Sequence, residues 1–417
     1  MATIMDIHAR EVFDSRADIT LEVEIALDNG KRGRSIIPTG CSKGKHEAVE
    51  IRDNDPRRFN GQGVLRAIDI VHTVIKPRLC GMSPYAQEEI DRMLIELDGT
   101  ANKSRLGANT ILGVSLAVAN AAAMQSNLSL CDYISHGQKK FMPQPIFSML
   151  SGGMHGDGNC DFQDYQVIAL KAPHLEAALQ IGKNIHIALK SLLMSRGIST
   201  GVSGTGGFLP PLSSNEQGLL LLLEAIRKAG YEPGLDVGLS MDIAAEMFFK
   251  DGLYHLATEG RTLTTVAFID YLASICKRYP IILMEDPLGE DDFKGWTALT
   301  QLLGGKIELV GDDLFTTNLA RFEQGIDMKM ANSILVKPNQ IGTLSETISL
   351  VASAKEAGYG IVFSRRSGET EDTSIADLAV ALNGTKVKFG SLARTEAMAK
   401  YNQLLRLQDA IANTQIV

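Results

Sequence analysis

The chain has few of the features that mark secreted and membrane-bound proteins. Its five cysteines are scattered, odd in number and never spaced as C-x-x-C, which favours free thiols in a reducing compartment over a disulfide framework. The most apolar stretch, residues 110–124, carries Thr, Ser and Asn, so it predicts a buried Ala-rich helix and not a transmembrane span. Charge occurs within the first six residues, so no signal-peptide core is expected. We therefore expect a cytoplasmic protein with no membrane partner.

An excess of positive charge is also missing. The sequence has 41 Lys and Arg residues against 49 Asp and Glu, a net charge of −8, which argues against a nucleic-acid partner held by bulk charge. A local basic pocket for a small anion remains compatible with this balance. The composition, 45% apolar and 22% charged, is typical of a globular protein. The length of 417 residues predicts two or three domains, or one large barrel with an appendage.

Residues 1–135 predict one α+β domain. Alternating apolar and polar residues in DITLEVEIALDNG, ending in Asn29-Gly30, indicate a strand followed by a turn. From Leu65 to about Ser135 the apolar residues recur with helical spacing, and strands followed by helices in one block favour an α+β unit. The polar and then Pro-containing segment 136–145 is the expected linker.

The remaining residues, 136–417, predict a (β/α) barrel. Short apolar runs such as DVGLSMD, YPIILMED, KIELVGDD, NSILVKPN and GIVFSRRS alternate with helical segments. Their polar ends follow one another at intervals of 25 to 43 residues, close to the length of one βα unit. In such barrels the chemistry lies where the strands end.

Three of these strand ends carry carboxylates, Asp242, Glu285 and Asp312. Carboxylates that converge on one mouth repel each other unless a cation lies among them, and an all-oxygen set suits Mg²⁺. Taken singly, each could instead form a salt bridge or a helix N-cap. Three at successive strand ends favour the metal site.

Other candidate groups are cationic. Lys337 ends the next strand and could act as a base, hold an anion, or simply balance the carboxylates. Arg366 and Lys400 are candidate anion clamps, although a lone Lys400 in EAMAKYNQLLR would ordinarily be a solvated helix residue. His155, in the Gly-rich segment LSGGMHGDGN, would more commonly be a surface histidine.

Together these segments resemble the enolase (phosphopyruvate hydratase) family over essentially the full length. The resemblance is carried by FDSRADITLEVEI, ELDGTANKSRLGANTILGVSLAVANA, SMDIAAEMFF, MEDPLGEDDFKGW, LVGDDLFTTN, LVKPNQIGTLSET, SRRSGETEDTSIADLAV and RTEAMAKYNQLLR. It implies an α/β protein with an N-terminal α+β domain, an enolase-type (β/α)₈ barrel, and a homodimer or higher homo-oligomer. It also implies a phosphorylated or phosphonylated carboxylate as substrate and two Mg²⁺ ions in each active site.

The resemblance further implies roles for individual residues. Lys337 matches the base that removes the C2 proton of 2-phosphoglycerate, and the carboxylates match the ligands of the first Mg²⁺. The other matching positions are Ser42 for the second Mg²⁺, Arg366 and Ser367 for the phosphate, Lys400 for the substrate carboxylate, and His155 and Gln163 beside the substrate.

Three substitutions fall where the C3 hydroxyl would leave. The family ordinarily has Gly-Asp-Glu-Gly-Gly-Phe where this chain reads SGTGGF, so Thr205 replaces the Glu that acts as general acid. Asp164 replaces a Glu, and Arg365 replaces a His. A Thr hydroxyl delivers no proton at neutral pH, and losing a general acid typically slows a reaction about 10²–10⁴-fold.

The combination suggests a changed reaction. The sequence is consistent with a specialised-metabolism paralogue in phosphonate or phosphinate biosynthesis, resembling carboxyphosphonoenolpyruvate synthase. The alternatives are an ordinary phosphopyruvate hydratase and a non-catalytic enolase-like binding protein. A drifted, inactive chain gives no reason for Lys337 and the three carboxylates to be kept.

Overall fold

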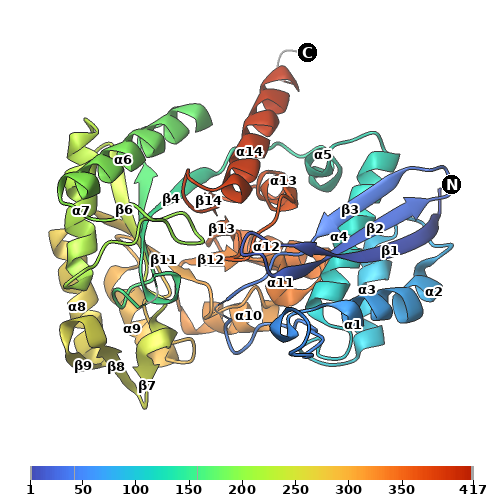
Figure 1. Cartoon of the computed structure of the whole chain (residues 1–417), viewed down its shortest axis with the longest axis horizontal. Helices are drawn as coiled ribbons and strands as arrows, with labels where there is room; N and C mark the ends of the chain where they lie inside the picture. Colours follow the sequence, from blue (N-terminus) through green and yellow to red (C-terminus); the bar gives the residue numbers. More distant parts are fainter. Residues whose placement is uncertain (1, 42, 157, 415–417) are drawn as a thin grey trace.

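A three-stranded sheet with flanking helices and a closed barrel lie side by side in the molecule (Figure 1). The structure is a computed structural model that describes residues 2–41, 43–156 and 158–414. The arrangement confirms the fold class expected from the sequence, an N-terminal α+β unit followed by an eight-stranded barrel.

The N-terminal sheet is antiparallel, in the order β1 (Ile4–Phe13), β2 (Ile19–Leu27), β3 (Arg32–Ile36). Helix α4 (Ala108–Gln125) covers one face of it and is almost wholly buried, as expected for the Ala-rich segment. Its small side chains allow a close approach: a Cβ added to Gly33 would lie 2.1 Å from the backbone nitrogen of Ala121. The other helical segments of this part are η1 (Phe59–Gly61), α1 (Leu65–Ile70), η2 (Val71–Ile75), α2 (Lys76–Leu79), α3 (Gln87–Asp98) and α5 (Leu130–Ser135).

The barrel closes in the order β10, β11, β12, β13, β14, β4, β5, β6. Its strands are β4 (Gln144–Ser151), β5 (Asp164–Ala169), β6 (Val237–Asp242), β10 (Ile281–Glu285), β11 (Glu308–Gly311), β12 (Ser333–Val336), β13 (Gly360–Ser364) and β14 (Lys386–Lys388). β5 runs antiparallel to both of its neighbours, so the barrel is not a uniform βα repeat. Apolar side chains fill the interior, among them Ile146, Leu283 and Val362.

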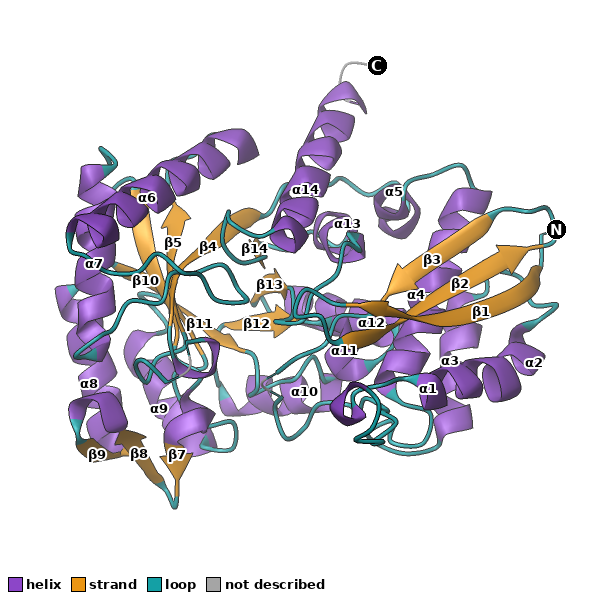
Figure 2. Ribbon diagram, in the orientation of Figure 1, coloured by secondary structure: helices purple, strands orange, loops and turns teal. Residues whose placement is uncertain are grey.

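Helices surround the barrel (Figure 2). They are α6 (Leu175–Ser195), α7 (Asn215–Lys228), α8 (Thr265–Arg278), α9 (Phe293–Leu303), α10 (Leu319–Met328), α11 (Pro338–Ile341), α12 (Leu344–Glu356), α13 (Ser374–Ala381) and α14 (Thr395–Thr414). A small sheet of β7 (Phe249–Lys250), β8 (Leu253–Leu256) and β9 (Arg261–Thr264) lies at the lower edge of the view, and short turns form η3 (Gly153–His155), η4 (Ala245–Phe248) and η5 (Ala257–Glu259). Among the described residues, no helix is long and apolar enough to cross a membrane.

The segment expected to be a linker, residues 136–145, is partly strand. β4 begins at Gln144, and Pro145 pairs with Val387 of β14. Proline is tolerated there because it is near the start of the strand. The extended connection therefore ends two residues earlier than the composition suggests.

Candidate active site

A cavity opens where the barrel strands end. Its lining includes Gly40, Ser148, His155, Gln163, Asp164, Thr205, Asp242, Glu285, Asp312, Lys337, Ser364, Arg365, Arg366, Ser367, Lys388 and Gly390. Eleven of the thirteen residues singled out from the sequence are therefore in this lining. The exceptions are Lys400 and Ser42, and Ser42 lies outside the described residues.

Strand direction explains why these side chains meet. Asp242 and Glu285 are the last residues of β6 and β10, and Asp312 follows β11 directly. β5 runs the opposite way, so its first residue, Asp164, lies at the same mouth and pairs with Asp242 in the sheet. The antiparallel strand therefore adds a carboxylate that an all-parallel barrel would place at the far end.

Two lysines interleave with the three candidate metal ligands. Lys388 Nζ donates to Asp242 Oδ2 at 2.7 Å and to Glu285 Oε2 at 2.6 Å. Lys337 Nζ donates to Asp312 Oδ2. The three carboxylates carry one more negative charge than the two lysines balance when all of them are ionised, and burial together with the Asp242 charge raises the pKa of Glu285 to about 8, so a proton on Glu285 meets this excess at neutral pH. Three buried carboxylates of this kind fit a divalent cation held by oxygen ligands, whose binding would displace that proton.

Lys337 is held in a defined position. Its backbone N–H donates to Thr317 Oγ1 at 2.9 Å, and its side chain is largely buried. Burial lowers the pKa of its ammonium, but the adjacent Asp312 carboxylate outweighs this effect and raises the pKa above its usual value.

Lys400, predicted to contact the substrate carboxylate, does not line this cavity. It is buried in α14, where Nζ donates to the Thr370 carbonyl at 2.5 Å and pairs with Glu369 Oε1 at 3.1 Å. Its charge is used to hold the loop after β13. The second cavity lysine is Lys388, which sequence reasoning missed because β14 has only three residues and was not recognised as a strand. Lys388 is the last residue of β14, and a lysine at a strand end is the sequence feature that could have identified it.

Asp286 fixes the position of Asp312. Its Oδ1 accepts the backbone N–H of Asp312 at 2.9 Å and its Oδ2 accepts that of Asp313 at 2.8 Å. Asp286 itself has a left-handed backbone, with φ of 40°, which is strained for a non-glycine residue. The carboxylates of Asp286, Asp312 and Asp313 have oxygen atoms within 4.8 Å of one another. Both oxygens of Asp286, however, already accept hydrogen bonds from backbone N–H groups. We interpret this group as a support for Asp312.

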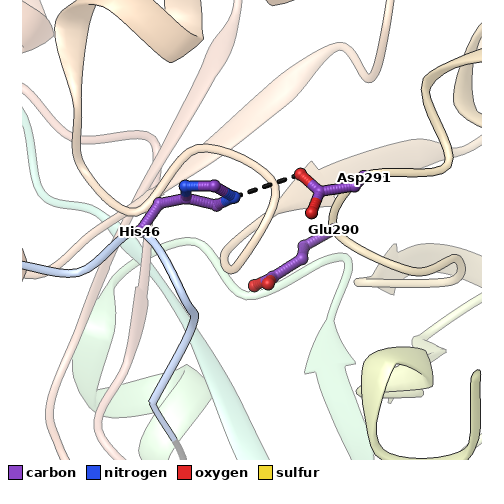
Figure 3. A group of neighbouring side chains, drawn as sticks. All are labelled: His46, Glu290 and Asp291. Carbon is purple, nitrogen blue, oxygen red and sulfur yellow. Dashed lines mark hydrogen bonds and ion pairs between the residues drawn. The ribbon is translucent and has the colours of Figure 1, made fainter.

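A second close group lies outside the cavity, formed by His46, Glu290 and Asp291 (Figure 3). His46 Nε2 is 3.1 Å from Asp291 Oδ1. Lys45 places its ammonium 3.2 Å from Glu290 Oε1, and Arg321 Nη2 lies 3.3 Å from Asp291 Oδ1. Lys45 and Arg321 therefore already neutralise the carboxylates of this group through ion pairs. It tethers the segment around residue 45 to the loop after β10.

His155 and Asp164 form an ion pair in the lining of the cavity. His155 Nδ1 lies 3.1 Å from Asp164 Oδ2. Burial would lower the pKa of this imidazole, but Asp164 raises it to about 9, and the pKa of Asp164 is lowered in turn, despite its burial, by His155. Gln163 Nε2 donates to Asp242 Oδ2 at 3.1 Å, so it orients a candidate ligand. Cys41 also faces His155, and although burial opposes it, this contact lowers the pKa of the thiol to about 6.

Thr205 lies against two serines that sequence reasoning did not identify. Its Oγ1 is 2.9 Å from Ser151 Oγ and 2.8 Å from Ser203 Oγ, and the two serine oxygens are 2.9 Å apart. Ser151 Oγ also donates to Asp164 Oδ1 at 2.9 Å. None of these hydroxyls is an acid at neutral pH.

Arg365, which directly follows β13, reaches the loop that carries Thr205. Its Nη2 donates to the Gly204 carbonyl at 3.1 Å, and its Nη1, buried and without a hydrogen-bond partner among the described residues, lies 3.7 Å from Glu396 Oε1. The guanidinium is packed so closely on Gly390 that a Cβ there would lie 2.7 Å from Nη2. Arg365 therefore fixes the Gly204–Thr205 loop, and its Nη1 keeps an unused hydrogen-bonding capacity.

The N-terminal part completes the opposite wall. Arg366 forms a bidentate pair with Glu47, at 2.9 and 3.1 Å, and its Nη1 also donates to Asn339 Oδ1. Ser367 Oγ accepts the backbone N–H of Cys41 at 2.9 Å. The predicted phosphate clamp thus lies at the junction with the N-terminal segment.

Comparison with known protein families agrees with this architecture. Residues 4–134 match the family described as "Enolase, N-terminal domain", and residues 139–417 match "Enolase, C-terminal TIM barrel domain". Members of this family are Mg²⁺-dependent, bind phosphorylated carboxylates and are typically lyases. With both domains matched over nearly its whole length, the chain belongs to the enolase family.

Proposed function

We propose that the chain is an Mg²⁺-dependent enzyme that removes the C2 proton of a 2-phosphoglycerate-type substrate and whose chemistry at the hydroxyl end is altered. The observation that carries this proposal is the division of the cavity. Asp242, Glu285 and Asp312 meet Lys337 and Lys388 on one side, whereas Thr205 and its serine neighbours stand where a carboxylic acid would be needed.

Each residue has a defined task in this proposal. Asp242, Glu285 and Asp312 would hold Mg²⁺, with Ser42 proposed for a second ion, and Lys388 is the cavity cation nearest to the first two carboxylates. When bound, Mg²⁺ supplies positive charge that stabilises the dianion formed after proton removal. Lys337 takes the proton, which requires it to be neutral at that moment. Arg366 and Ser367 are proposed to hold the phosphoryl group.

Arg365 supports a substrate with an additional anionic group. Its Nη1 is buried and lacks a hydrogen-bond partner among the described residues, and guanidinium groups bind carboxylate, phosphate and phosphinate oxygens in fixed geometry. We therefore propose a paralogue that serves specialised metabolism, in phosphonate or phosphinate biosynthesis, with a role like that of a carboxyphosphonoenolpyruvate synthase. This finer assignment rests on analogy with enolase-like enzymes of that kind.

An ordinary phosphopyruvate hydratase is the second candidate, and one observation favours it. His155, with its pKa raised to about 9 by Asp164 in spite of burial, carries a proton at neutral pH at the hydroxyl end of the cavity. If it could reach the C3 hydroxyl, it could replace the missing acid.

The deciding experiment is ¹H and ³¹P NMR of 2-phosphoglycerate in D₂O with the protein and Mg²⁺. Under the main proposal, the C2 proton signal disappears while phosphoenolpyruvate does not accumulate. Rapid formation of phosphoenolpyruvate would establish the hydratase instead. A C2 signal that persists would contradict both, because neither reaction proceeds without proton removal. Lys337→Ala is the control, since exchange due to a contaminating enzyme would survive this substitution.

A further inference from the structure

Lys400 lies on the buried face of α14, where a lysine needs partners for its charge. Ala397 and Leu404, about one helical turn before and after it, are fully buried, and Lys400 itself is 0% exposed. A buried ammonium group loses its hydration and is tolerated only where other groups pair with it. Because Lys400 also does not line the cavity, any role that it has in binding must act through its partners.

Those partners lie in residues 366–370, named here the clamp turn, which follow β13 closely. Lys400 Nζ donates to the Thr370 carbonyl at 2.5 Å and lies 3.1 Å from Glu369 Oε1. Among the described residues, Lys400 is the one cation that forms an ion pair with this carboxylate. Glu369 and Thr370 are each 3% exposed, so solvent does not replace the ammonium group.

The Glu369 carboxylate holds the clamp turn from within. Its Oε2 accepts the backbone N–H of Arg366 at 3.0 Å, and its Oε1 accepts that of Thr370 at 3.1 Å. The Glu369 backbone is held by the N-terminal part, since the Ser15 N–H donates to its carbonyl at 2.8 Å. One buried carboxylate therefore fixes the backbone from which the Arg366 side chain starts.

The charge of Lys400 keeps this carboxylate ionised. Without it, Glu369 would be a buried carboxylate with no cation, and taking up a proton would relieve that cost. A protonated carboxyl group carries its hydrogen on one oxygen, which is then a poor acceptor. One of the two backbone N–H groups would lose its partner, and the clamp turn would be held at one end only.

We propose that Lys400 is a positioning residue for phosphoryl binding, which acts through Glu369 on the backbone of Arg366 and Ser367. Both of these residues line the cavity. The inference rests on the proposed function, because that function assigns the phosphoryl group to Arg366 and Ser367. An indirect action on the phosphoryl group thus replaces the direct contact with the substrate carboxylate that the sequence predicted for Lys400.

A purely structural role would give a different result. General loosening of the chain weakens the binding of every ligand, whereas a displaced clamp turn weakens the ligand that carries a phosphoryl group. The candidate metal ligands Asp242 and Glu285 end β6 and β10, and Asp312 follows β11, so they lie outside the clamp turn. The affinities for 2-phosphoglycerate and for the metal alone therefore separate the two roles.

The test is Lys400→Met, which keeps an extended side chain and removes its charge. Isothermal titration with Mg²⁺ should show 2-phosphoglycerate binding about tenfold more weakly, as is usual for residues that orient ligand contacts. The affinity for Mn²⁺ alone, followed by electron paramagnetic resonance, should not change, because the carboxylates keep their positions. If the affinities for Mn²⁺ and 2-phosphoglycerate fell equally, Lys400 would have only a structural role and the inference would be overturned.

Lys103→Met is the matched control. Lys103 is 4% exposed, and its Nζ lies 2.9 Å from Glu346 Oε1, but it does not line the cavity. This variant loses a comparable buried ion pair and should keep the affinity for 2-phosphoglycerate. An equal loss of that affinity in both variants would overturn the inference, because the effect would then come from reduced stability.

Glu369→Gln tests whether Lys400 acts through Glu369. A glutamine side chain has one acceptor oxygen, so one backbone N–H loses its partner and 2-phosphoglycerate should bind about tenfold more weakly. Adding Lys400→Met should weaken binding little further, since both substitutions disturb the same turn. Additive losses, about a hundredfold in the double variant, would overturn the inference. If Lys400→Met does not fold, an unchanged affinity in Glu369→Gln would overturn it as well.

Failure of this inference and failure of the proposed function are distinguishable. If the unaltered chain exchanges the C2 proton and Lys400→Met binds 2-phosphoglycerate equally well, the role of Lys400 is overturned and the proposed function stands. If Lys400→Met selectively loses affinity for 2-phosphoglycerate while the unaltered chain does not exchange the C2 proton, the positioning role is supported and the proposed reaction is contradicted.

Discussion

At the scale of single residues, the two sides of the cavity differ in the groups that they present. Lys337 and Lys388 contact buried carboxylates, whereas the Thr205 hydroxyl contacts the hydroxyls of Ser151 and Ser203. The sequence showed that Thr205 replaces the family's acidic residue. It did not show that Ser203 fills the space beside Thr205. This neighbour matters because a longer side chain at position 205 would need the volume that Ser203 Oγ occupies.

Restoring the acid should therefore require three substitutions together. Thr205→Glu with Arg365→His and Ser203→Gly should raise the rate of 2-phosphoglycerate dehydration by about 10²-fold or more, the usual contribution of a general acid. Phosphoenolpyruvate formation, followed by its ultraviolet absorbance, measures this. The control combines Thr205→Gln with the same two other substitutions, because a glutamine side chain has the same shape but no proton to give. Equal rates in the two triple variants would show that the hydroxyl end was wrongly interpreted.

The ion pair between His155 and Asp164 should make stability depend on pH. The pKa of His155 is raised from 6.5 to about 9 by Asp164, against the effect of burial, so its contribution is complete below pH 6.5 and is lost as the pH rises through 9. The lowered pKa of Asp164 gives a contribution that is lost only in acid. We expect about 1–3 kcal/mol of unfolding free energy to disappear between pH 6.5 and 9.

Denaturant unfolding with a chelator present, at several pH values, measures this loss. His155→Gln keeps a hydrogen bond to Asp164 but cannot be charged, so its stability should change less across the same interval. If the unfolding free energy of His155→Gln changed with pH as much as that of the unaltered chain, the pH dependence would come from other groups.

At the scale of elements, strand ends were the predictable part of the site. The apolar runs before Asp242, Glu285, Asp312 and Lys337 are strands that end at or next to these residues, because a buried parallel strand reads as an apolar run. Lys388 was missed because a three-residue strand gives almost no pattern. The reversed direction of β5 and the approach of Ser151 to Ser203 depend on tertiary pairing, which local spacing does not encode.

The link between β10 and β11 through Asp286 should control metal affinity. Asp286→Asn replaces an oxygen acceptor by an amide donor that faces the backbone N–H groups of Asp312 and Asp313. Displacing Asp312 in this way should weaken Mg²⁺ binding about 10–100-fold, as is usual for residues that orient ligands. Mn²⁺ binding followed by electron paramagnetic resonance gives the affinity without relying on activity.

Asp98→Asn is the matched control for this substitution. Asp98 is also buried and accepts backbone N–H groups, from Leu106 at 2.6 Å and Arg105 at 3.1 Å, but it lies in the N-terminal part and does not line the cavity. Both variants should lose about 1–3 kcal/mol of stability. Only Asp286→Asn should lose metal affinity. If both variants lost the same metal affinity, the effect would come from the general loss of stability and not from the orientation of Asp312.

At the scale of the whole molecule, the site belongs to both parts of the chain. Thr39 pairs with Gly368 across the junction, Glu47 neutralises Arg366, and Cys41 N–H reaches Ser367. The division into residues 1–135 and 136–417 is our proposal for the folding units, but neither would contain a complete cavity. Homo-oligomerisation remains a prediction from the family resemblance.

Mg²⁺ should stabilise the whole chain through the cavity carboxylates. A ligand at 100 times its dissociation constant adds about 2.7 kcal/mol to the unfolding free energy, which for a chain of this size raises Tm by about 3 °C. Asp242→Asn should abolish the shift, because it removes one of three carboxylates whose charge the lysines leave unbalanced. Asp291→Asn should leave it unchanged, since Lys45 and Arg321 already neutralise the group in Figure 3.

Thermal unfolding with increasing Mg²⁺ measures all three proteins. Loss of the shift in Asp291→Asn alone would move the metal to the His46 group and remove the basis for placing proton abstraction beside Lys337.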